Sequence, residues 1–171
     1  HALRFGAYRV LGEADIAAAV AAAAQADVAV VFAGLNAEWD NEGLDRSGIT
    51  LPHSQNALIA RVVAANPRTV VVLQTGSPVA LPWLADVPAV LQAWYPGQEC
   101  GNAIADVLLG TAEPGGRLPQ TWPMQLQDTV GFGNARHYPG VDGHVVYAEG
   151  VFIGYRHYQQ NYLQVEPPVK L

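Results

Sequence analysis

The chain has 171 residues, enough for one domain with a sizeable core but too few for a second full domain. Half of the residues are hydrophobic and only 14% are charged, which excludes a disordered tail and a coiled coil. The net charge is −6, no stretch is basic and no apolar run reaches the roughly 18 residues that span a membrane, so we expect neither a nucleic-acid nor a membrane partner.

The first part of the chain alternates helix and strand patterns. Residues 13–25 are rich in alanine, the strongest helix former, and predict a helix. Residues 28–33 are a short, continuously apolar run, which predicts a strand buried on both faces, as in parallel sheets. A polar loop is expected over 35–51. A second helix should begin at Leu51-Pro52 and end at Asn66-Pro67.

The alternation then repeats. Strands are predicted over 69–73 and 89–94, separated by a short helical segment over 78–86. A further helix is predicted over 98–109, with Gly110 as its cap. Alternating strands and helices indicate an α/β fold: a layered α/β sandwich, flavodoxin-like, with a mostly parallel sheet and right-handed crossovers.

The alternation stops after Gly115-Gly116. Residues 117–122 could add a strand, and 123–148 are rich in proline, glycine and histidine and predict a long surface excursion. The aromatic segment 151–158 is expected to pack back on the domain. The tail, 161–171, contains two consecutive prolines and is expected to be extended.

The loop after the first strand carries most of the candidate chemistry, because ligands of open parallel sheets bind at the carboxyl ends of the strands. This loop contains four acidic residues and one basic residue, Arg46. The acids are Glu38, Asp40, Glu42 and Asp45. Crowded carboxylates oppose one another's ionisation, so one pKa should rise, as a general acid requires. A solvated acidic loop is the simpler interpretation. A calcium loop is disfavoured, since Ile49 occupies the position of the bidentate acid.

Two other acids and one aromatic side chain are candidates. Glu99 starts a predicted helix, where capping is the ordinary role of an acid. Glu149 precedes the aromatic segment and could equally be an exposed turn residue. Trp39 lies beside the acids, and aromatic rings near carboxylates suit sugar faces, although rim packing is more common.

The sequence predicts no cofactor. It lacks a dinucleotide fingerprint, a phosphate-binding lysine loop and a nucleophile elbow. The five histidines show no metal spacing, and the single cysteine, Cys100, excludes a cysteine-based zinc site, so no metal is expected. The chain starts at His1 without a signal-peptide pattern, which we interpret as an excised piece of a larger protein. We expect the protein to be soluble. The sequence does not distinguish between a cytoplasmic, a periplasmic and a secreted location.

Six ordered segments carry a family resemblance. They are Glu42-Gly43-Leu44-Asp45-Arg46, Asn66-Pro67 before Thr69-Val70-Val71-Val72-Leu73, Ala93-Trp94-Tyr95-Pro96-Gly97-Gln98-Glu99, residues 101–110, Pro114-Gly115-Gly116-Arg117-Leu118-Pro119, and Glu149-Gly150-Val151-Phe152-Ile153-Gly154-Tyr155-Arg156. Together they resemble the second, α/β-sandwich domain of family 3 glycoside hydrolases, the β-glucosidase group. The resemblance covers roughly residues 15–158.

The resemblance implies a division of labour between two domains. A (β/α)₈ barrel, absent from this chain, would carry the aspartate nucleophile and most of the glucose-binding residues. This chain would supply the acid/base, which the Glu-Gly-x-Asp-Arg motif identifies as Glu42. In the plant exoglucanase branch the acid/base falls instead in the Pro-Gly-x-Glu segment, here Glu99. Asp45 and Arg46 would then position the loop, and Trp39 would bind substrate or anchor the loop.

The implied function is a retaining, exo-acting β-glucosidase that removes terminal β-D-glucosyl residues. The expected partners are a β-glucoside or short β-gluco-oligosaccharide and a barrel-bearing chain or domain. The start of the chain, residues 1–12, resembles the end of an inserted PA14-type module. Residues 13–160 would form the sandwich domain, and 161–171 the tail. A non-catalytic, flavodoxin-like binding or interaction module is the alternative.

Overall fold

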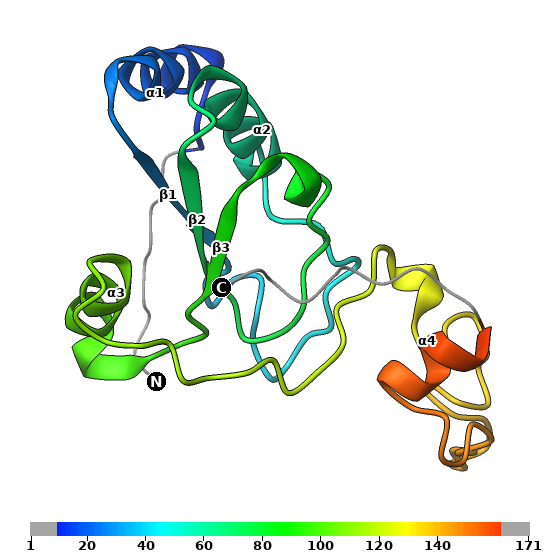
Figure 1. Ribbon diagram of the computed structural model, residues 1–171. Helices are drawn as coiled ribbons and strands as arrows, with labels where there is room; N and C mark the ends of the chain where they lie inside the picture. Colours follow the sequence, from blue (N-terminus) through cyan, green and yellow to red (C-terminus); the bar gives the residue numbers. More distant parts are fainter. Residues whose placement is uncertain (1–9, 162–171) are drawn as a thin grey trace, which may run out of the picture.

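Three parallel strands form the centre of the structure, a computed structural model in which residues 10–161 are described (Figure 1). The strands are β1 (Ala29–Gly34), β2 (Thr69–Gln74) and β3 (Ala89–Gln92), in the order β1-β2-β3. Their register places Val31 beside Val71 and Val71 beside Val90. The predicted parallel α/β architecture is therefore confirmed, and the carboxyl ends of all three strands meet at one edge.

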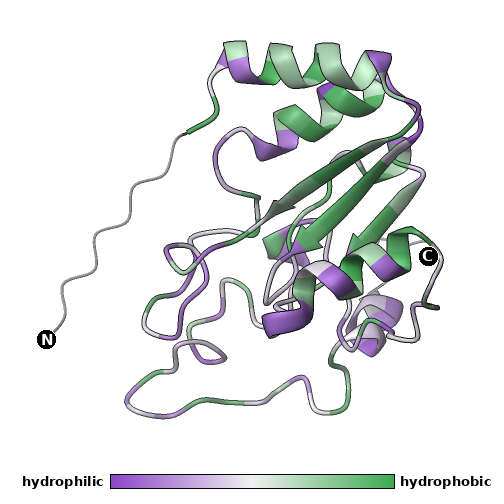
Figure 2. Ribbon diagram, turned by 90° about the vertical axis from the view of Figure 1, so that its left-hand side faces the viewer, coloured by the Kyte–Doolittle hydropathy of each residue, from purple (hydrophilic) through white to green (hydrophobic). Residues whose placement is uncertain are grey.

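Helices cover both faces of this sheet. Helices α1 (Glu13–Gln25) and α2 (Gln55–Ala65) lie together over one face, and α3 (Cys100–Leu108) lies on the opposite side (Figures 1 and 2). The remaining elements are short: η1 (Leu84–Asp86), η2 (Gly97–Glu99), η3 (Leu126–Asp128) and α4 (Tyr155–Asn161). Gly110 ends α3 with a positive φ of 74°, the left-handed conformation that glycine adopts most easily.

The main core lies between the sheet and α1/α2. Alternate strand residues point to this face, among them Val71 and Leu73, which are both fully buried. They belong to one cluster with Ile59 and Val62 of α2. Burying a side chain of this size contributes about 1.5–3 kcal/mol each, so this layer supplies much of the driving force for folding. The three strands are hydrophobic along most of their length (Figure 2).

A buried asparagine joins the ends of α1 and α2. The amide of Asn66 donates to the carbonyls of Ala23 and Ala26 at 2.9 Å each, and its oxygen accepts from the backbone N–H of Arg68. These bonds reach the carboxyl end of α1 and its C-cap, where the last carbonyls of a helix lack the usual N–H partner four residues on. Asn66-Pro67 therefore ends α2 as predicted, and also fixes α1 against it.

The expectation that the first strand is buried on both faces is wrong for this chain. On the face away from α1 and α2, Val30 of β1 is 42% exposed and Phe32 is 56% exposed, whereas Val72 of β2 is fully buried on that same face. The reason is position: β1 is an edge strand, and no described element covers this part of it.

One helix boundary, one predicted strand and one packing prediction also differ. Helix α2 begins at Gln55 rather than at 51–52, because His53 has a positive φ of 52° and cannot continue a helix. Residues 117–122 are irregular rather than a strand. Segment 151–158 does not pack on the sheet: Phe152 and Ile153 are exposed, and α4 lies with η3 in a separate lobe (Figure 1). Tyr158 is buried within that lobe.

The predicted surface excursion, residues 123–148, is confirmed as an irregular and largely exposed segment. Most of the predicted PA14-like end and almost all of the predicted tail lie outside the described residues. Within residues 10–161, no helix has both the length and the hydropathy needed to cross a lipid bilayer.

Candidate active site

The acidic loop starts at a close contact between the first two strands. A Cβ on Gly34 would lie 2.1 Å from the carbonyl oxygen of Gln74, so only glycine fits here. The side-chain amide of Gln55 binds both backbone groups of Gly34: it accepts from the N–H at 2.8 Å and donates to the carbonyl at 2.9 Å. The end of β1 is thereby joined to β2 and to the start of α2, and the loop departs from a fixed point.

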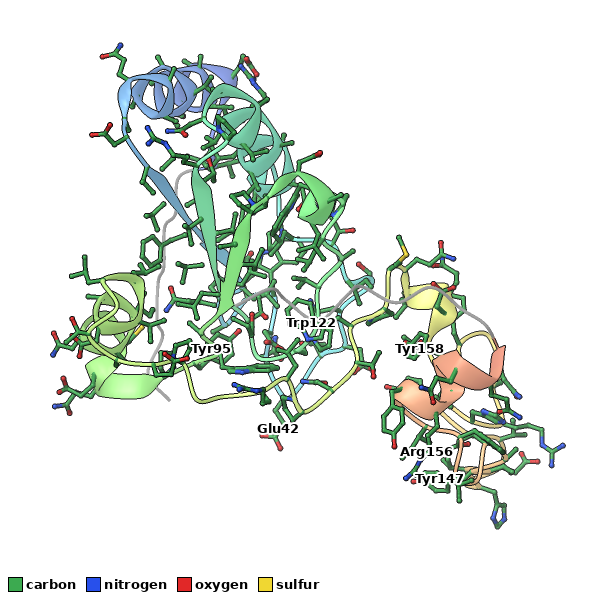
Figure 3. The ribbon with its side chains drawn as sticks, viewed as in Figure 1. Glu42, Tyr95, Trp122, Tyr147, Arg156 and Tyr158 are labelled. Carbon is green, nitrogen blue, oxygen red and sulfur yellow. The ribbon has the colours of Figure 1, made fainter. Side chains whose placement is uncertain are left out.

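Glu42 lies at the tip of a tight turn in this loop. Asn41 and Leu44 form an isolated antiparallel bridge, and the N–H of Gly43 donates to the side chain of Asn41 at 3.0 Å. This local bond is the one that asparagine commonly supplies in turns. Glu42 is exposed, its side chain points away from the sheet (Figure 3), and its carboxylate has no hydrogen bond or ion pair to any described residue.

The loop is attached to the rest of the domain on both sides of Glu42. Before it, the Oδ2 of Asp40 accepts from the N–H of Gly76 at 3.0 Å and from the hydroxyl of Tyr95 at 2.9 Å. After it, Arg46 donates from Nη2 to the hydroxyl of Ser77 at 2.8 Å and to the carbonyl of Pro78 at 3.1 Å. Both attachments reach residues 76–78, the loop that follows β2.

These contacts change the interpretation of the acidic cluster. Asp40 is bound by Gly76 and Tyr95, and Asp45 accepts a hydrogen bond from the hydroxyl of Tyr138. The carboxylates are therefore held by separate partners and do not converge on one point. Arg46 binds the hydroxyl of Ser77 and the carbonyl of Pro78, and not the carboxylate of Glu42. Among residues 10–161, neither oxygen of Glu42 has a hydrogen-bond or ion-pair partner.

Both contacts involve tyrosines: Tyr95, which lies in one of the segments that carry the family resemblance, and Tyr138, which the sequence did not single out. Tyr138 lies in the irregular excursion, 93 positions from Asp45, and the hydrogen bond to Asp45 raises the pKa of its phenol. Burial raises the pKa of Tyr95, and the hydrogen bond to Asp40 and the charge of Asp40 raise it further. Both phenols therefore stay protonated, and able to donate, throughout the neutral range.

Trp39 is placed between the acidic loop and the core. Its ring meets that of His53 edge to face, with centroids 5.4 Å apart, and it packs against the buried cluster. It also lines a cavity of about 390 Å³ beside the end of β1. The predicted anchoring of the loop by Trp39 is consistent with this packing, whereas its contact with a substrate stays a prediction.

The two rival acids lie in different surroundings. Glu99 precedes the first turn of α3, and its Oε2 accepts from the side chain of Asn102 at 2.7 Å, so it has a local structural partner at the helix start. Glu149 is in the separate lobe, two residues from Tyr147, which lies well away from Glu42 (Figure 3). The structure does not bring Glu42 and Glu149 together.

Within residues 10–161, no group of three His, Cys, Asp or Glu side chains lies close enough together to hold a metal ion. The site thus consists of one exposed carboxylate on a turn that is fixed at both ends.

Comparison with known proteins identifies the family. Residues 5–155 match the family model described as the glycosyl hydrolase family 3 C-terminal domain. The chain belongs to the family 3 glycoside hydrolases. A β-glucosidase of Rhizobium radiobacter is 53% identical over 167 residues, which are 97% of this chain and 20% of that protein. A probable β-glucosidase I of Aspergillus terreus is 49% identical over 158 residues, 92% of this chain and 18% of that protein.

Solved structures show the same arrangement of the chain. A β-glucosidase from Kluyveromyces marxianus, in complex with glucose, has a TM-score of 0.83 and 46% identity, with coverage of 92% of this chain and 19% of that one. The Streptomyces venezuelae β-glucosidase DesR, in complex with D-glucose, has a TM-score of 0.83 and 42% identity, with coverage of 92% and 20%. The chain therefore spans about a fifth of the relatives it matches. The PA14-containing branch stays a prediction.

Proposed function

We propose that Glu42 is the general acid/base of a retaining, exo-acting β-glucosidase whose nucleophile lies on a separate barrel domain. One observation carries this assignment. Glu42 is the acid of the loop whose carboxylate is exposed and unpaired among the described residues, while the turn that holds it is fixed on both sides by Asp40 and Arg46. A free carboxylate on a fixed turn suits proton transfer to a bound substrate.

The proposed reaction proceeds in two steps. The barrel's carboxylate attacks the anomeric carbon, and Glu42 protonates the departing glycosidic oxygen, which gives a glucosyl-enzyme and the free aglycone. Glu42, now ionised, removes a proton from a water molecule that attacks the same carbon, which releases glucose and regenerates both carboxyl groups. In retaining enzymes the two carboxyl groups lie about 5–5.5 Å apart, so the barrel must cover the turn that carries Glu42.

The substrate class follows from the relatives. Those that match are named β-glucosidases, and two solved ones hold glucose, so we infer a β-glucoside or a short β-gluco-oligosaccharide as substrate. No observation favours the non-catalytic interaction module over this enzyme. Asp45 and Arg46 are proposed to position the loop, and Trp39 to anchor it or to line the aglycone side.

Azide rescue in the complete enzyme distinguishes Glu42 from Glu99 and Glu149 as the acid/base. We expect Glu42→Ala to leave a slow glucosyl-enzyme whose turnover azide restores, because azide can attack the anomeric carbon without the help of a base. The product would be the β-glucosyl azide. Glu99→Ala and Glu149→Ala should show no rescue and should act through stability alone. Rescue of Glu99→Ala but not of Glu42→Ala would move the role to Glu99.

The proposed partner of the chain is the barrel-bearing remainder of the same enzyme. Within residues 10–161, β1 is an edge strand with no partner on its outer side, Val30 and Phe32 are exposed, and a groove of about 420 Å³ lies between β1, α1 and α2. Its C-terminal lobe exposes further large apolar side chains: Phe132, Tyr138, Val141, Val145, Tyr147, Val151, Phe152, Ile153 and Tyr155. Apolar surface and an open edge on this scale are typical of regions that another polypeptide covers.

We therefore expect an interface of more than about 2,000 Å² in total between this chain and the rest of the enzyme. Co-expression with the barrel-bearing part should yield a stable complex, whereas the chain expressed without it should aggregate or bind hydrophobic dyes. Size-exclusion chromatography with light scattering measures both results. A monomeric, cooperatively melting isolated chain would contradict the prediction.

A further inference from the structure

We propose that Asp40, held by Gly76 and Tyr95, is a positioning residue that sets the direction of the Glu42 carboxylate; the inference rests on the proposed acid/base role of Glu42. Asp40 is two residues from Glu42, and its contacts extend to two other loops. Gly76 is 36 positions away and Tyr95 is 55 positions away, so three loops that follow three different strands meet at one carboxylate oxygen.

The geometry of this contact depends on glycine at position 76. A Cβ there would lie 2.7 Å from Oδ2 of Asp40 and 2.7 Å from Cε2 of Tyr95. Both distances are too short for real atoms, so a larger residue would displace either Asp40 or the Tyr95 ring. The absence of a side chain lets the backbone N–H of Gly76 approach the carboxylate at 3.0 Å.

The third member, Tyr95, is placed by a strained backbone. Trp94, the residue before it, has a positive φ of 55°, a conformation that is uncommon for a large side chain. The Trp94 ring packs against the core and meets the ring of the buried Trp122, with centroids 6.5 Å apart, which compensates for the strain. The chain thus turns sharply after β3, directly before the residue whose hydroxyl reaches Asp40.

These contacts matter for Glu42 because its own side chain has no hydrogen bond or ion pair to the described part of the chain. The turn 41–44 is held locally, but its orientation depends on where it is attached, at Asp40 on one side and Arg46 on the other. Releasing the Asp40 side would let the turn pivot about Arg46. A displacement of about 1 Å in a proton-transfer group can cost 10²-fold in rate.

The test compares substrates with good and poor leaving groups in the complete enzyme. Asp40→Ala should lower kcat/KM about 10–100-fold for an alkyl glucoside, which needs protonation, and much less for an activated aryl glucoside. Asp40→Asn should stay within about 3-fold of the wild type, because an amide oxygen still accepts both hydrogen bonds. Gly76→Ala and Tyr95→Phe should also lower kcat/KM more for the alkyl glucoside than for the aryl glucoside. The effect of Tyr95→Phe should be the weaker of the two.

Asp106→Ala provides the matched control, since it removes the same charge from an exposed site on α3. It should leave kcat/KM for both substrates unchanged. An equal loss of Asp40→Ala activity on both substrates would overturn the inference, because a purely structural role would not depend on the leaving group. So would full activity of Asp40→Ala on the alkyl glucoside. Glu42→Ala is assayed in parallel: if it too shows no dependence on the leaving group, the acid/base assignment itself fails, which distinguishes the two failures.

Discussion

Replacing Glu42 with alanine is expected to lower kcat/KM for glucosides with poor leaving groups by about 10²–10⁴-fold, the usual contribution of a general acid. The alkoxide of an alkyl aglycone departs only when it is protonated, and Glu42→Ala would remove the proposed proton donor. A nitrophenolate departs without protonation, so formation of the glucosyl-enzyme from an activated aryl glucoside should be affected much less. Hydrolysis of that intermediate should still be slow, because Glu42 is the proposed base of that step as well.

A series of aryl glucosides of graded phenol pKa measures this difference. We expect a steep dependence of kcat/KM on the leaving-group pKa in Glu42→Ala and a shallow one in the wild type. Glu113→Ala, which removes an exposed glutamate of the same charge far along the chain, should behave as the wild type. Equal loss across the whole series would indicate that Glu42 binds or stabilises but does not donate the proton.

The elements of the fold that depend on local pattern were predicted closely from the sequence. The alanine-rich segment gave α1 at Glu13–Gln25, and the apolar runs gave β1 and β2 to within one residue. The exposure of β1 was not predictable in this way. An apolar run indicates that a strand is covered on both faces in its native surroundings, but not whether the covering segment belongs to the same stretch of chain.

The same distinction between local sequence patterns and contacts of distant residues applies to the candidate site. The motif that contains Glu42 is continuous in sequence, so the family resemblance could single out this residue as the candidate acid/base. The contacts that fix the turn join residues 31 to 93 positions apart, as in Arg46 with Ser77 and Asp45 with Tyr138. No periodicity in the sequence marks such pairs, and none marks the contact of Asp40 with Gly76. The same limit explains the separate lobe, whose irregular segments carry no repeating pattern.

The close contact at Gly34 leads to a prediction about both stability and activity. In Gly34→Ala, the new Cβ would lie 2.1 Å from the carbonyl oxygen of Gln74 and 2.9 Å from its carbonyl carbon, both of them backbone atoms that cannot rotate away. The end of β1 must therefore separate from β2, which overpacking of this kind makes unfavourable by about 1–3 kcal/mol or more. Separation would also strain the two hydrogen bonds between Gly34 and the side chain of Gln55.

Hydrogen exchange in the complete enzyme localises this effect. The N–H of Leu35 donates to the carbonyl of Gln74 at 2.9 Å, so in Gly34→Ala it should exchange faster, together with the last amides of β1 and the first turn of α2. Since the loop that carries Glu42 begins at this point, kcat/KM for alkyl glucosides should fall as well. Gly48→Ala is the control, because nothing lies within 4 Å of a Cβ at that glycine of the same loop. An unchanged exchange rate of the Leu35 amide in Gly34→Ala would mean that β1 and β2 are not in close contact at Gly34. It would also contradict the view that the Glu42 loop starts from a fixed point.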